Sequence, residues 1–73
     1  MVIWIARDKN WENDWGEVEP GNLTAFYDSP ILEHHFRGDM WGCARVIGNI
    51  PNYMFPEIKP GECKKFIEEN FNI

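Results

Sequence analysis

The sequence predicts a small α+β domain, in which a curled antiparallel sheet of three or four strands is followed by a short C-terminal helix. Short runs of β-branched and aromatic residues are separated by loops of Gly, Pro, Asn and acidic residues, which is typical of a small sheet. Apolar residues near the C-terminus recur at helical spacing. An all-β domain, either SH3-like or a meander, is the alternative. Residues 1–73 form one domain, because a chain of this length builds a single small core.

The first two strands are the clearest elements. Residues 2–7 are nearly continuous in β-branched and aromatic side chains, which predicts a well-covered strand. Residues 22–28 show a two-residue period that fits a second strand, in which Leu23, Ala25 and Tyr27 alternate with Thr24, Phe26 and Asp28. Ser29-Pro30 ends this strand, because proline donates no hydrogen bond to a neighbouring strand.

The middle of the chain is less regular. Residues 31–39 are ambiguous and fit one helical turn. Residues 40–47 return to strand character, and Gly48-Asn49 is a turn signal. Residues 50–60 contain three prolines and are expected to run extended along the sheet. The side chains expected to anchor this run on the core are Tyr53, Met54, Phe55 and Ile58.

The segment at 62–71 has two interpretations. Four of its apolar side chains fall at i, i+3, i+4 and i+8, which favours a short helix. These side chains are Cys63, Phe66, Ile67 and Phe71. A last strand is the alternative. Elsewhere, large rings are expected to fill the core, since each buries about 150–250 Å². The expected core rings are Trp4, Phe26, Trp41, Phe55 and Phe66.

The net charge of −5 restricts the class of partner. Acidic side chains crowd residues 8–19 around one cation, Lys9. Such a surface repels phosphate groups, so we expect no binding to nucleic acid or to an anionic membrane, whereas a basic protein partner is compatible with it. The apolar run at the N-terminus breaks at Arg7, which is too soon for a signal peptide. We therefore expect a cytoplasmic protein in which Cys43 and Cys63 are free thiols.

The acidic loop also permits a cation-binding hypothesis. With Asp8 in the first position, oxygen-bearing side chains fall at the offsets of an EF-hand calcium loop. The sixth position is Asn13 instead of glycine, and the preceding segment is strand-like, so an acidic loop between strands explains the same residues. The residues of this alternative metal site are Asp8, Asn10, Glu12, Asp14 and Glu19.

Two tryptophans in this polar loop are the main candidates for a binding surface. Trp11 and Trp15 fit three roles, which are contact with a partner protein, capping of the small core, and closure of a homodimer. Exposed Trp is enriched at binding hot spots, where one ring contributes more than about 2 kcal/mol. The candidate partner-binding residues are Trp11, Glu12, Asp14, Trp15, Glu17 and Glu19.

The reactive side chains do not form a recognisable catalytic or cofactor site. His34 and His35 are adjacent, so their side chains diverge, and neither has zinc-ligand spacing to the cysteines. A thiol nucleophile would also need an oriented base and an oxyanion site. The sequence therefore predicts a protein that is not an enzyme and that uses no cofactor or metal.

Three segments carry a resemblance to other proteins. WIARDK at 4–9, LTAFYDSPI at 23–31 and IPNYMFPEIK at 50–59 resemble a group of short proteins of unknown role encoded in bacterial, prophage and phage genomes. Those proteins open with an aromatic-I-A-R-D-K strand and carry a proline-glutamate element. This chain departs from them by a long insertion at 10–21 and by its helix-like tail. The resemblance implies a small β-rich fold of unknown role, and it identifies no active-site residues in this chain.

Together, these observations predict a small non-catalytic protein-interaction domain. The resemblance implies that a mobile element encodes the protein. The function that we expect is that of a phage or mobile-element accessory protein that binds and modulates a larger host protein through the acidic, Trp-bearing surface. A calcium-binding module on residues 8–19 and a structural subunit or homodimer are the alternatives.

Overall fold

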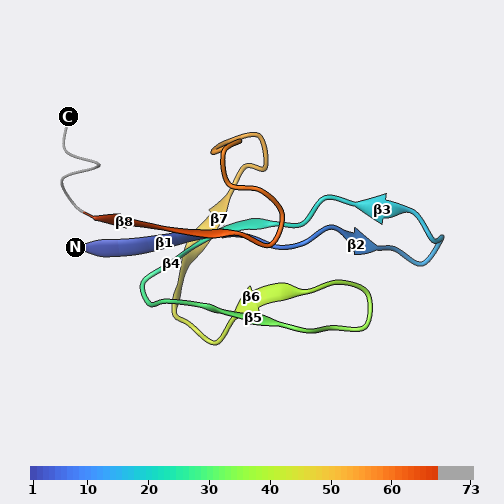
Figure 1. Ribbon diagram of the computed structural model, residues 1–73, viewed down its shortest axis with the longest axis horizontal. Coiled ribbons are helices and arrows are strands. Elements are labelled where there is room, and N and C mark those ends of the chain that lie inside the picture. Colours follow the sequence, from blue (N-terminus) through green and yellow to red (C-terminus); the bar gives the residue numbers. More distant parts are fainter. Residues whose placement is uncertain (68–73) are drawn as a thin grey trace.

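The structure is a computed structural model that describes residues 1–67, and within this range the chain is all β. Eight strands form one four-stranded sheet and two two-stranded sheets, all antiparallel (Figure 1). The predicted α+β class is therefore wrong for the described residues, and the all-β alternative fits. No helix among these residues is long or apolar enough to cross a bilayer.

The four-stranded sheet has the order β7-β4-β1-β8. Its strands are β1 (Val2–Arg7), β4 (Leu23–Phe26), β7 (Val46–Ile50) and β8 (Cys63–Ile67). The register places Ile5 of β1 opposite Ala25 of β4 on one side and opposite Lys64 of β8 on the other. β1 has a partner on both sides and is therefore an inner strand of the sheet, in which Ile5 and Ala6 are buried and the other residues are half-buried.

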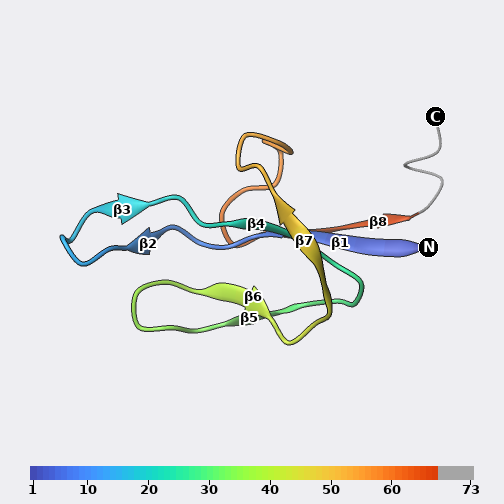
Figure 2. The same ribbon diagram turned by 180° about the vertical axis from the view of Figure 1, so that it is seen from behind.

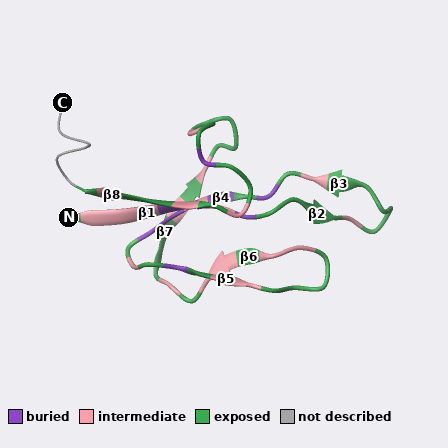
Figure 3. Ribbon diagram, viewed as in Figure 1, coloured by how far each residue is buried: buried purple, intermediate pink, exposed green. Residues whose placement is uncertain are grey.

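The core gathers where β1 and β4 run side by side (Figure 3). Its members are Ile5, Leu23, Ala25 and Ile58. Beside it, Phe55 and Phe66 pack edge to face, with their ring centroids 5.6 Å apart. Of the five rings expected in the core, Phe26 is buried and the other four are half-buried. The core is therefore mainly aliphatic, with rings at its margin.

One side chain holds the loop between β7 and β8 on the sheet. The Arg7 guanidinium donates hydrogen bonds of 2.6–3.2 Å to four carbonyl oxygens of this loop. They belong to Asn52, Met54, Phe55 and Ile58. The loop is a series of turns instead of the expected extended run, because its carbonyls bend toward one guanidinium. Of its expected anchors, Ile58 is buried and Phe55 is half-buried, whereas Tyr53 and Met54 are exposed.

Two hairpins extend from the same end of the sheet and lie side by side (Figures 1 and 2). Their strands are β2 (Trp11–Glu12), β3 (Val18–Glu19), β5 (Ile31–Glu33) and β6 (Met40–Gly42). The β2–β3 hairpin continues the chain beyond β1 and returns it to β4. The N-terminus lies at the opposite end of the molecule, where Val2 pairs with Ile67 (Figure 1).

The middle of the chain differs from its prediction. Residues 31–39 form β5 and a loop instead of a helical turn. The strand expected at 40–47 is interrupted at Cys43, whose φ of 58° is a left-handed conformation that no regular strand contains. Gly48 and Asn49 lie inside β7, opposite Ala25 and Thr24 of β4, so the predicted turn is wrong.

The predicted C-terminal helix is also wrong within the described range. Cys63–Ile67 forms β8, which pairs with β1 along its whole length. This pairing gives β1 its second neighbour and brings Phe66 against Phe55, so tertiary contacts outweigh the local helical spacing. The rest of the predicted helix, residues 68–71, lies outside the described residues.

Candidate interaction surface

The two hairpins are tied together along their length. Backbone hydrogen bonds join the Lys9 amide to the Asp39 carbonyl (3.2 Å) and the Glu12 amide to the Arg37 carbonyl (2.9 Å). Nearer the tips, the Arg37 guanidinium pairs with the Asp14 carboxylate. The Asp39 carboxylate lies 3.0 Å from His34 Nδ1 and 3.3 Å from Lys9 Nζ, and these partners lower its pKa. The hairpins therefore form one unit.

Two glycines permit close contacts in the hairpin unit, one between the two hairpins and one between the arms of the β2–β3 hairpin. A Cβ at Gly38 would lie 2.8 Å from the Cβ of Trp11, so the β5–β6 loop approaches β2 only without a side chain there. A Cβ at Gly21 would lie 2.3 Å from the Asp8 carbonyl oxygen and 2.6 Å from that of Lys9. Gly21 thus allows the two arms of the β2–β3 hairpin to meet where they leave the sheet.

The tip of the β2–β3 hairpin is a fixed turn organised by Asn13. Its side-chain Oδ1 accepts hydrogen bonds from the amides of Trp15 (2.9 Å) and Glu17 (3.0 Å). Its Nδ2 donates to the Glu19 carboxylate at 3.0 Å. Gly16 completes the turn with a φ of 77°, a conformation that glycine adopts without strain. The turn holds the Trp15 backbone in one place.

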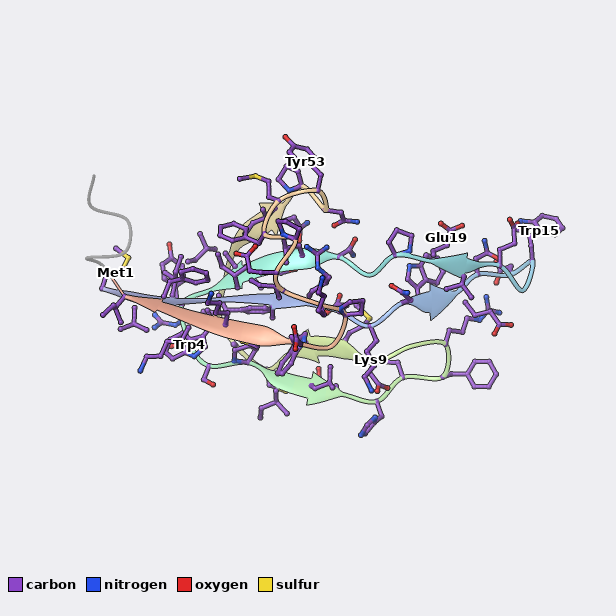
Figure 4. The ribbon with its side chains drawn as sticks, turned by 45° about the horizontal axis from the view of Figure 1, so that its top comes forward. Met1, Trp4, Lys9, Trp15, Glu19 and Tyr53 are labelled. Carbon is purple, nitrogen blue, oxygen red and sulfur yellow. The ribbon has the colours of Figure 1, made fainter. Side chains whose placement is uncertain are left out.

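Aromatic rings stand on this hairpin unit with little cover. The Trp15 side chain is 85% exposed at the tip of the β2–β3 hairpin (Figure 4), and Phe36, in the β5–β6 loop, is 99% exposed. Trp11 is 42% exposed nearer the sheet. We call these three residues the aromatic end. The high exposure of Trp15 shows that it does not cap the core, which was one of its three expected roles.

Two depressions lie along the aromatic end. An open hollow of about 470 Å³ lies between the hairpin tips. Its lining is Glu12, Asn13, Asp14, Trp15, Gly16, Phe36 and Arg37. A smaller pocket of about 260 Å³ lies closer to the sheet, where Trp11 and Met40 provide its apolar walls and Lys9, His35 and Arg37 its basic groups. The first depression is edged by exposed rings and carboxylates, the second by apolar and basic side chains.

The structure brings most of the predicted partner-binding residues to one end. Glu12, Asp14 and Trp15 line the same hollow, and Glu17 is exposed beside them in the Asn13 turn. Trp11 lines the neighbouring pocket. Glu19 is half-buried and accepts a hydrogen bond from the Asn13 side chain, so its carboxylate supports the turn.

Sequence reasoning missed the contribution of the second hairpin. Phe36 and Arg37 line the hollow together with Trp15, although they are distant in sequence. Phe36 lies within the polar run EHHFRGD, which is the pattern that singled out Trp11 and Trp15 in their own loop. The sequence therefore contains a signal for Phe36, although residues 31–39 also fit one helical turn.

The residues of the calcium hypothesis are not gathered around one point. The Asp8 carboxylate is buried, accepts a hydrogen bond from the Trp41 amide (2.8 Å), and has a pKa raised by burial. Asp14 pairs with Arg37, and Glu19 accepts from Asn13. Among residues 1–67, no three His, Cys, Asp or Glu side chains could hold a metal ion together.

The thiols are in environments that keep them protonated. The Cys43 thiol donates a hydrogen bond to the Glu33 carboxylate at 3.2 Å, and this neighbour raises its pKa. Burial raises the pKa of Cys63. Because the thiolate is the nucleophilic form, both environments oppose reactivity. His34 and His35 are both exposed and do not share a site, since His34 pairs with Asp39 and His35 lines the smaller pocket.

Comparison of the chain with protein-family models, with curated proteins and with solved structures gives no match. The arrangement of the hairpins is therefore the basis of the functional argument.

Proposed function

We propose that this protein is a small non-catalytic binding protein that attaches to a larger protein through its aromatic end. The observation that carries the proposal is the exposure of Trp15 and Phe36 on two hairpins that are fixed to each other. Covering an exposed ring with a partner removes its apolar surface from water, which stabilises the complex. Trp is among the residues most enriched at binding hot spots. The resemblance to phage-encoded proteins makes a host protein the expected partner.

The rigidity of the hairpins supports this role. Ordering a flexible loop on binding costs free energy, which weakens the affinity that its rings can provide. Here the Asn13 side chain organises the turn that carries Trp15, and the Glu12–Arg37 backbone bond fixes the β5–β6 loop that carries Phe36. The backbone that carries both rings is therefore held in one arrangement before contact.

The proposal is tested with the Trp15→Ala/Phe36→Ala double variant used as bait in a lysate of a host cell. Removal of both rings should lower the affinity for the captured protein at least about thirtyfold, because a hot-spot ring contributes more than about 2 kcal/mol. The double variant should keep the wild-type circular dichroism and melting temperature, since neither ring is buried.

Tyr53→Ala is the matched control, because Tyr53 is an 81% exposed ring on the loop between β7 and β8, away from the aromatic end. Its substitution should leave capture unchanged. Equal capture by the wild-type protein and a folded double variant would contradict the proposal.

A further inference from the structure

The hollow between the hairpin tips has the chemistry to receive one kind of side chain, and this inference rests on the proposed function. Its lining carries two carboxylates, Glu12 and Asp14, and one guanidinium, that of Arg37. Arg37 is paired with Asp14, so these two charges offset each other. Within residues 1–67, no hydrogen bond or ion pair engages the Glu12 carboxylate, which lies near Gly16 in the same hollow. The hollow therefore keeps one uncompensated negative charge.

The Glu12 carboxylate shares the hollow with aromatic rings, which distinguishes it from an ordinary acidic side chain on the surface. Trp15 and Phe36 line the same hollow and belong to different hairpins. The face of an aromatic ring attracts a cation, and Trp does so most strongly. A ligand between the hairpin tips therefore meets π-faces and a free carboxylate together, which favours a cation with a flat apolar surface.

We propose that the hollow binds an arginine side chain of the partner protein, with its guanidinium against the aromatic rings and paired with Glu12. Arginine suits this arrangement better than lysine, because its guanidinium is planar, stacks on rings, is weakly hydrated and donates two parallel hydrogen bonds to one carboxylate. The Glu12 carboxylate lies beside the turn that carries Trp15, since a Cβ at Gly16 would be in van der Waals contact with Glu12 Oε1 at 3.8 Å. The partner is thus a protein segment that presents arginine in neutral or basic surroundings.

The test uses a nine-residue peptide with three arginines and otherwise neutral residues, and the same peptide with citrulline in place of each arginine. Citrulline has the shape of arginine without its charge. A two-dimensional NMR titration should show shifts at the Trp15 indole N–H and the Gly16 amide with the arginine peptide. The citrulline peptide should bind about tenfold more weakly, because it loses both the cation–π attraction to the rings and the ion pair with Glu12.

Two variants with the same change of charge locate the effect. Glu12→Gln should weaken binding of the arginine peptide about three- to fivefold, whereas Glu57→Gln, at an exposed carboxylate on the loop between β7 and β8, should leave it unchanged. Equal losses in the two variants would mean that the peptide responds to net charge alone, which would overturn the inference. So would equal affinity for the two peptides, or no binding of either peptide.

The outcomes also separate this inference from the proposed function. If both peptides bind equally and the Trp15→Ala/Phe36→Ala variant binds neither, the aromatic end is a contact surface without arginine selectivity. The inference then fails while the proposed function stands. If the double variant binds the arginine peptide as tightly as the wild type does, the rings do not form the site, and the inference fails together with its structural basis.

Discussion

The sheet and the hairpin unit use large apolar side chains in opposite ways. In the sheet, Ile5 and Leu23 are almost completely buried, and they stabilise the fold by leaving water. In the hairpin unit, Trp15 and Phe36 are almost completely exposed, and the fold gains little from them. The hairpins are held together instead by backbone hydrogen bonds and ion pairs, and they approach each other closely at glycine. The comparison indicates that the sheet provides most of the hydrophobic stabilisation, whereas the hairpin unit leaves its rings available for contact with a partner.

Truncation of a core side chain in the sheet should cause the largest loss of stability. Leu23→Ala should lower the free energy of unfolding by about 2–5 kcal/mol, because it removes buried methyl groups and leaves a cavity. Leu23 has no exposed surface. Urea denaturation followed by circular dichroism measures the change. Trp15→Ala is the comparison variant, and its free energy of unfolding should stay within about 0.5 kcal/mol of the wild type. A loss in Trp15→Ala as large as that in Leu23→Ala would erase the proposed division between the two regions.

The junction between the two regions should be the next most sensitive position. Gly21→Ala should cost about 1–3 kcal/mol, because its Cβ would overlap the backbone carbonyls of Asp8 and Lys9, which cannot move like a flexible side chain. Gly48→Ala is the control, since a Cβ at Gly48 meets no atom within 4 Å. Thermal melts of both variants test this prediction. A Gly21→Ala protein as stable as Gly48→Ala would show that the hairpin arms separate freely at this point.

A smaller loss is expected from the side chain that holds the loop between β7 and β8. Arg7→Lys should cost about 1–2 kcal/mol, because an ammonium group cannot reproduce the guanidinium's bonds to several loop carbonyls. Hydrogen exchange should accelerate at the amides of Met54 and Ile58, which form the turns of this loop. Amides of the β2–β3 hairpin serve as the internal reference. Faster exchange there as well would mean that Arg7 stabilises the whole molecule instead of its own loop.

The smallest expected effect is a loss of folding stability at acidic pH, when Asp28 becomes protonated. Hydrogen bonds from Arg45 lower the pKa of Asp28, at the end of β4, from 3.8 to about 2. Because the folded protein binds this proton more weakly than the unfolded chain does, the stabilisation is complete above pH 3.8 and is lost as the pH falls toward about 2. Asp28→Asn should therefore be less stable than the wild type at neutral pH by a small amount, since the pair is exposed.

Melting temperatures measured between pH 7 and pH 2 test the sign of this effect. The difference between the wild type and Asp28→Asn should shrink as the pH falls below 3.8. A difference that grows in this window would contradict the assignment of the acid sensitivity to the Asp28–Arg45 pair.

The sequence predicts those parts of the fold whose side-chain pattern agrees with their neighbours in space. Residues 2–7 and 23–26 are strands because their apolar residues meet each other across the ladder. The segment at 63–67 has helical spacing but becomes a strand, because β1 presents a free edge that only the folded sheet reveals. Local pattern and tertiary pairing conflict there, and pairing prevails.

The candidate site was predicted in part for the same reason. Trp15 and its acidic neighbours lie on one hairpin and could be recognised from their own loop. Phe36 and Arg37 join them only through the contact between the hairpins, which depends on Gly38 and on the Glu12–Arg37 backbone bond. No local pattern indicates which loop will lie beside which. That part of the site required the structure.

The pairing of β1 with β8 has a consequence for synthesis. β1 is an inner strand of the sheet, yet one of its two partners, Cys63–Ile67, is made after all the other described strands. Until then, one edge of β1 has no neighbour in the growing chain. Such distant pairings slow folding and leave an edge open to other nascent chains. Chains cut short before Cys63 should therefore be prone to aggregate.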